Sequence, residues 1–168
     1  MVLGPNQTEQ LHIEDEEPGF VIDTSAFIKL DPYYLDVFPS LWNAIEELIN
    51  QGRLISPQEV LIEIHEFYDD GWNKWVKQHK KMFLDKKETQ LHASQIQNWY
   101  PGLTNKDGTK TDADYYVIGL AKYMGNGWTV VTDESRKRAN LRIPHVCEKM
   151  KIPCVDLHNF FKKCKWKY

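Results

Sequence analysis

The sequence has few cysteines, and none in the arrangements that build disulfide frameworks or structural zinc sites. Cys147, Cys154 and Cys164 are odd in number and form no Cys-x-x-Cys pair. This pattern argues against both kinds of site and predicts reduced thiols. No stretch approaches the roughly 20 apolar residues that span a bilayer, and no basic segment followed by an apolar run marks a secretory signal. We therefore expect a cytoplasmic protein without a membrane partner.

Positive charge is missing from the first 20 residues. This segment has no Lys or Arg and carries five acids, Glu9, Glu14, Asp15, Glu16 and Glu17. Without them the net charge of −3 becomes about +2. The composition predicts that residues 1–18 form an acidic, mobile extension and residues 19–168 a single domain. Its mildly basic charge permits nucleic-acid binding without requiring it.

Short apolar runs alternate with helical patterns along the domain. The predicted strands cover residues 19–23, 54–55, 128–132 and 153–155. Four helices are predicted outside residues 71–98. The first covers residues 41–49, with Ser40 as its N-cap, and the second begins at a capping box at 56–59 and runs to Phe67. The other two cover residues 112–124 and 157–163. Residues 71–98 indicate one or two surface helices broken near Asp85. This alternation predicts an α/β protein with helices on both faces of a mostly parallel sheet.

Carboxylates follow two of the predicted strands. In such folds ligands gather at the carboxyl ends of the strands, where Asp23 and Asp133 lie. Several acids without His or Cys partners are the ligand chemistry of Mg²⁺. Asp23 closes an apolar strand, where an unpaired charge is costly. Its alternative role is to cap the turn that begins at Thr24.

Two further acids lie on the apolar stripes of predicted helices. Glu63 has no local structural reason to be there, whereas Glu59, one turn earlier, completes a capping box. Asp114 likewise projects along a buried face, whereas Asp112 suits the first turn of a helix capped by Thr111. We therefore interpret Glu63 and Asp114 as candidate ligands. Glu59 and Asp112 remain open between cap and ligand.

Asp133 and Glu134 directly follow the third predicted strand. Adjacent residues of a strand point in opposite directions, so one of them could face the site and the other solvent. The alternative is that both belong to the charged mouth of the loop that leads to Arg136. Periodicity does not decide between them.

Four segments together resemble the PIN-domain nucleases. They are Phe20-Val-Ile-Asp23-Thr-Ser, Ser56-Pro-Gln-Glu-Val-Leu-Ile-Glu63, Asp114-Tyr-Tyr-Val-Ile-Gly-Leu-Ala121 and Trp128-Thr-Val-Val-Thr-Asp-Glu134. Each is weak alone, but the four occur in the family's order over residues 19–163. The sequence departs from the family pattern in having Glu134 where Asp is more usual and Gly119 in place of a frequent Ala.

The resemblance implies a PIN-like, Rossmannoid three-layer α/β/α sandwich. It implies a catalytic Mg²⁺ or Mn²⁺ held by Asp23, Glu63, Asp114 and Glu134 or Asp133. It further implies hydrolysis of single-stranded RNA, and its toxin-like branch implies a toxin of a toxin–antitoxin pair, an antitoxin protein as partner and a homodimer. The alternative function is a PIN-fold interaction module with weak or no catalysis that binds a protein partner.

The lysine-rich stretch after the second segment also has two interpretations. Trp72 and Trp75 could stack on bases while the lysines follow a nucleic-acid backbone. The alternative is a solvated helix whose indoles lie in the core.

Overall fold

A computed structural model describes residue 17 and residues 19–67, 70–103, 112–135 and 141–167. Almost all of the predicted N-terminal extension lies outside these residues, as does Thr111. Within the described part, no helix is long and apolar enough to cross a membrane.

The strands form one parallel sheet in the order β3-β2-β1-β4-β5. Their bounds are β1 Gly19–Ile22, β2 Leu54–Pro57, β3 Phe83–Leu84, β4 Trp128–Val131 and β5 Cys154–Val155. Central strand β1 is fully buried, as expected for a parallel sheet covered on both faces. The predicted parallel sheet is therefore confirmed. The sequence prediction missed β3, because this edge strand has only two residues and is too short to show an alternation of apolar and polar side chains.

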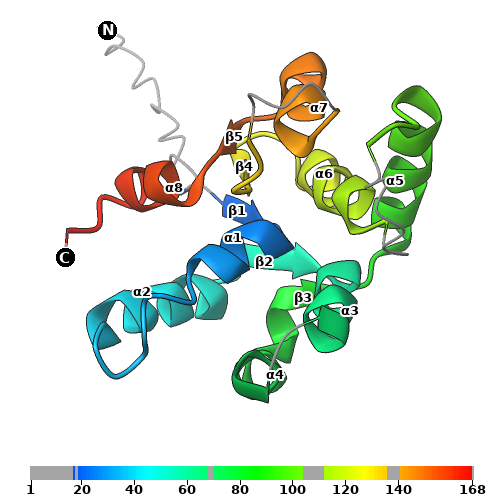
Figure 1. The fold of residues 1–168 in the computed structure, drawn as a ribbon. Coiled ribbons are helices and arrows are strands. Elements are labelled where there is room, and N and C mark those ends of the chain that lie inside the picture. Colours follow the sequence, from blue (N-terminus) through cyan, green and yellow to red (C-terminus); the bar gives the residue numbers. More distant parts are fainter. Residues whose placement is uncertain (1–16, 18, 68–69, 104–111, 136–140, 168) are drawn as a thin grey trace, which may run out of the picture.

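Eight α-helices are found among the described residues. They are α1 Thr24–Lys29, α2 Pro39–Asn50, α3 Gln58–Phe67, α4 Asp70–Gln78, α5 Lys87–Trp99, α6 Ala113–Met124, α7 Ile143–Met150 and α8 Leu157–Lys163, with a 3-10 turn, η1, at Lys80–Met82. Helices α2 and α8 lie on one side of the sheet, and α5, α6 and α7 lie on the other (Figure 1). The three-layer α/β/α architecture is confirmed.

Several predicted helix starts are wrong. Ser56 lies in β2, and its Oγ donates a 2.7 Å hydrogen bond to the Ile22 carbonyl of β1. That hydroxyl is engaged across the sheet and does not cap α3, so the predicted capping box does not form. The N-cap of α2 is Phe38, which places Ser40 inside the helix. Asp112 is the N-cap residue of α6 and does not lie in its first turn.

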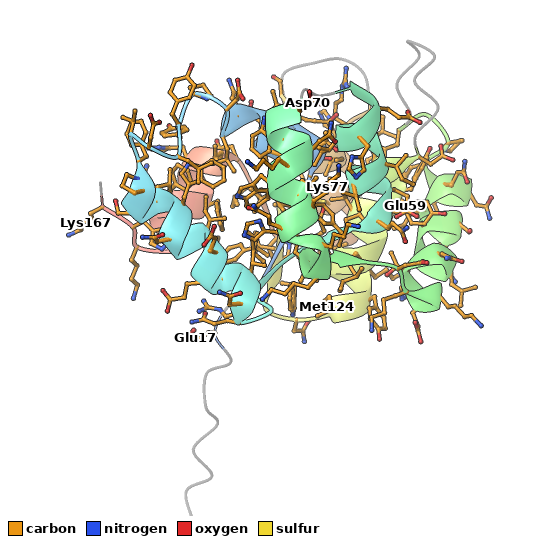
Figure 2. The ribbon with its side chains drawn as sticks, turned by 90° about the horizontal axis from the view of Figure 1, so that it is seen from below. Glu17, Glu59, Asp70, Lys77, Met124 and Lys167 are labelled. Atoms are coloured by element: carbon orange, nitrogen blue, oxygen red, sulfur yellow. The ribbon has the colours of Figure 1, made fainter. Side chains whose placement is uncertain are left out.

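The indoles of α4 pack into the protein. Trp75 is 5% exposed, and its ring centroid lies 5.5 Å from that of Trp42 on α2 and 6.0 Å from that of Trp72. Figure 2 shows α4 alongside α2, with Asp70 and Lys77 near its two ends. For Trp75 the core interpretation is therefore correct. Trp72 remains partly exposed.

Gly119 lies where α6 contacts the backbone of α5. A Cβ atom at this position would lie 3.0 Å from the Ala93 nitrogen and 3.1 Å from the Thr89 carbonyl oxygen. Backbone atoms within a helix have little room to move away. The close contact between the two helices therefore explains why glycine occupies this position.

We expect Gly119→Leu to destabilise the protein by about 1–3 kcal/mol, the usual cost of overpacking a core. Leucine is a better helix former than glycine, so helix propensity cannot cause the loss. Thermal unfolding measures it, and Gly102→Ala is the control because a Cβ at Gly102 meets nothing within 4 Å. Equal melting temperatures for Gly119→Leu and the parent chain would contradict the packing argument.

Candidate metal centre

The candidate site lies at the carboxyl edge of the two central strands. Asp23 follows β1 directly, and Thr132, Asp133 and Glu134 follow β4. The backbone N–H of Asp23 donates a 2.9 Å bond to the Val131 carbonyl, which fixes the two strand ends side by side. Helix α3 contacts both α1 and α6, so Glu63 and Asp114 are brought to the same edge.

Asp23 is both a helix cap and a buried acid. It is 3% exposed, and its Oδ2 accepts bonds from Ser25 Oγ at 2.6 Å, Thr132 Oγ1 at 3.0 Å and the Ser25 N–H at 3.3 Å. Burial raises the pKa of this carboxyl, and the hydrogen bonds from Ser25 and Thr132 oppose the rise. The capping alternative is thus correct, and it coexists with a carboxylate held in a fixed orientation.

Glu63 reaches the start of α1 from α3. The Thr24 hydroxyl donates a hydrogen bond to Glu63 Oε2, which ties α3 to the start of α1. Glu59, one turn earlier, has a different neighbourhood. Burial raises its pKa, and the carboxylate of Asp85 adds to the rise. Glu59 therefore lies apart from the cluster, although it is not a capping-box residue either.

Asp114, in the first turn of α6, is the acid most affected by the others. Its pKa is raised well above the ordinary value, first by burial and then by the carboxylates of Asp23, Glu134 and Glu63, while the Arg142 guanidinium opposes the rise. Carboxylates act on one another in this way only at short range. The acids from β1, α3, α6 and the end of β4 therefore share one electrostatic site. We call Asp23, Glu63, Asp114 and Glu134 the acid cluster.

Asp133 and Glu134 point to different partners. Glu134 accepts a 2.8 Å bond from the Ile143 N–H at the start of α7 and a 3.3 Å bond from Arg142 Nη1. Burial raises its pKa, and the Asp23 carboxylate adds to the rise. The carboxylate of Asp133 instead lies 3.5 Å from Lys29 Nζ. The structure therefore groups Glu134 with the cluster and pairs Asp133 with Lys29.

Arg142 and α7 were not recognised in the sequence as part of the site. Arg142 is the N-cap residue of α7, and Pro144 lies in the first turn of that helix. Proline is common at this position, so Ile143-Pro144 is the signal that could have revealed the helix. Both Arg142 and the helix N-terminus face Glu134, where a carboxylate is favourable.

A hollow lies beside Glu134, one acid of the cluster, and extends towards β5. A cavity of about 470 Å³ is lined by Thr132, Asp133, Glu134 and Ser135 on one side and by residues of α7, β5 and α8 on the other. This volume falls within the roughly 300–1,000 Å³ of sites that hold a small ligand or substrate group.

The donor set fits a divalent cation. The carboxylates of Asp23, Glu134 and Glu63 raise the pKa of Asp114, and that of Asp23 also raises the pKa of Glu134. Added positive charge would relieve this repulsion. Among the described residues, no group of three or more His, Cys, Asp or Glu side chains lies close enough together to hold a metal ion by itself. Mg²⁺ commonly uses one or two carboxylates and keeps several waters. The residues therefore suit an ion bound partly through water.

Comparison with known proteins identifies a family. Residues 20–168 match the family described as a domain of unknown function, DUF4411. A search of curated protein sequences finds no match. The matched region includes every strand of the sheet except the first residue of β1, and it contains all four acids of the cluster. The chain belongs to the DUF4411 family.

Proposed function

We propose that the protein is a metal-dependent ribonuclease with a PIN-like fold. The observation that carries the proposal is the acid cluster, in which three carboxylates from distant segments raise the pKa of the fourth, Asp114, at one sheet edge. The parallel sheet order 3-2-1-4-5 and the sequence resemblance to PIN-domain nucleases support the same proposal. Single-stranded RNA, a toxin role and an antitoxin partner follow from the resemblance alone.

The acids differ in what holds them. Asp23 is fixed by Ser25 and Thr132, and Glu134 by Arg142 and the start of α7. Ligands held by such outer partners keep their orientation when an ion binds. We propose Asp23 and Asp114 as the residues that hold a Mg²⁺ or Mn²⁺ ion, with Glu63 and Glu134 completing the anionic pocket. When bound, the ion would activate a water and neutralise charge on the scissile phosphate.

The hydroxyl groups around the acids hold the carboxylates in position. The Thr24 hydroxyl is directed to Glu63, and those of Ser25 and Thr132 lie 3.1 Å apart beside Asp23. They keep the carboxylates in one orientation, so little reorganisation is needed when a substrate arrives. Arg142 limits the negative charge of the pocket, which favours the approach of a phosphate.

A mixed pool of single-stranded RNA incubated with Mn²⁺ tests the proposal. We expect cleavage by the parent chain, loss of cleavage with a chelator and loss of cleavage in Asp23→Asn. Asparagine is also a good helix cap, so this variant should keep α1 while removing the charge. Equal cleavage by Asp23→Asn and the parent chain would remove the catalytic assignment. No cleavage by either, together with tight binding of a protein partner, would favour the interaction-module alternative.

A further inference from the structure

A second cavity lies between the loop after α1 and the start of α4. Its volume is about 230 Å³, and its aromatic and acidic walls are formed by Asp31, Tyr33, Tyr34, Trp42, Trp72 and Trp75. We call it the aromatic pocket. Its volume is below the roughly 300–1,000 Å³ that encloses a whole small ligand. The pocket therefore suits a single side chain better than a cofactor.

The walls of the aromatic pocket are held in place by two indole hydrogen bonds. Trp42 Nε1 donates to the Tyr33 carbonyl at 2.6 Å, and Trp72 Nε1 donates to Asp31 Oδ1 at 3.1 Å. The Trp42 and Trp72 rings, with centroids 6.0 Å apart, are inclined by 55°, so they present differently directed surfaces. An occupant would meet aromatic surfaces that are already positioned, which lowers the entropy cost of binding.

The charge around the aromatic pocket selects the kind of occupant. Asp31 is the acidic group of the wall, and none of the described residues that form the wall is Lys or Arg. Asp36 in the same loop and Asp70 at the start of α4 (Figure 2) are also exposed acids. Aromatic faces attract cations, and a carboxylate beside them adds to that attraction. The same carboxylates repel the phosphates that accompany a nucleobase.

The rim of the aromatic pocket is apolar and exposed. Tyr34 and Leu35, which line the pocket, are 65% and 52% exposed. Val37, two residues further along the same loop between α1 and α2, is 61% exposed. Grouped apolar side chains on a protein surface mark interaction sites more often than isolated ones do. An occupant that covers this rim brings apolar side chains next to its cation.

We propose that the aromatic pocket binds an arginine side chain of a partner protein, in a segment where apolar residues flank the arginine. Arginine is favoured over lysine because its flat guanidinium stacks on indole rings and also pairs with a carboxylate. The guanidinium contacts Trp72 and Asp31, and the flanking residues cover Leu35 and Val37. This interaction surface is separate from the acid cluster and does not depend on catalysis there.

Tryptophan fluorescence with a short acetylated peptide, carrying one arginine between two leucines, tests the proposal. The full chain should bind this peptide about tenfold more tightly than the same peptide with citrulline, which keeps the shape and lacks the charge. Asp31→Asn should weaken arginine binding to a similar extent, because asparagine still accepts the Trp72 N–H but carries no charge. Tyr34→Ala should weaken it as well, and Tyr34 is exposed enough for the variant to fold.

Trp99→Ala is the matched control, since Trp99 is a 57% exposed tryptophan on α5, on the other side of the sheet. It should leave peptide binding unchanged. Equal binding of the arginine and citrulline peptides, or no binding at millimolar peptide, would overturn the proposal. It would also be overturned if Tyr34→Ala abolished binding of an oligouridine, or dissociated a dimer of the chain, without changing peptide affinity.

Discussion

Asp114→Asn should lower metal-dependent RNA cleavage by more than about 100-fold, the upper end of the loss caused by removing a partner of a metal ligand. Asp114 is the acid on which Asp23, Glu134 and Glu63 all act, so it lies at the electrostatic centre of the cluster. Asparagine keeps the shape of the side chain and removes the charge that would hold a cation. Initial rates over a range of Mn²⁺ concentrations measure the effect.

Asp133→Asn provides the control for this experiment. Asp133 is adjacent in sequence to a member of the cluster, but its carboxylate lies against Lys29 and is 30% exposed. An exposed ion pair of this kind contributes little to stability. We expect activity within a few-fold of the parent chain. A loss in Asp133→Asn as large as that in Asp114→Asn would mean that Asp133, and not only Glu134, serves the site.

The same Asp114→Asn substitution should make the metal-free protein more stable at neutral pH. The folded state raises the pKa of Asp114, whereas an unfolded Asp has a pKa of about 3.9. The native state therefore binds more protons than the unfolded state between these values, and the contribution of Asp114 to stability is lost as the pH rises through the folded pKa. Asparagine has no proton to lose and avoids this cost.

Each unit of pKa shift corresponds to about 1.4 kcal/mol, and Asp114 is partly accessible to solvent. We therefore expect a gain on the order of 1 kcal/mol at pH 7, or roughly 2–4 °C in a domain of this size. The difference between variant and parent should shrink as the pH falls towards 4. Thermal unfolding in chelator across this pH range provides the measurement. A lower melting temperature for the variant at pH 7 would contradict the repulsion argument.

Added Mg²⁺ or Mn²⁺ should reverse the order of the two proteins. A ligand that binds only the native state stabilises it by about 2.7 kcal/mol at 100 times its Kd. The parent chain should therefore gain stability with the metal, and Asp114→Asn should gain much less. An equal gain in both would place the ion elsewhere. A site that lowers stability in order to bind its cofactor is a common trade-off between stability and activity.

Local patterns in the sequence were enough to predict the type of fold and three of the four acids of the cluster. Apolar runs ending in acids located β1 and β4, and an acid on an apolar helix stripe located both Glu63 and Asp114. These features depend on residues a few positions apart, and their periodicity is a direct consequence of strand and helix geometry. That the acids function in catalysis stays a prediction.

The tertiary structure decided what local patterns left open. Ser56 reads as a cap but bonds to β1, 34 residues away, and Thr132 bonds to Asp23 across 109 residues. Glu134, and not Asp133, was assigned to the acid cluster because the first N–H of α7 donates to Glu134, whereas Lys29 pairs with Asp133. A side chain's partner across the fold is set by packing between segments distant in sequence, and a local pattern holds no information about that packing.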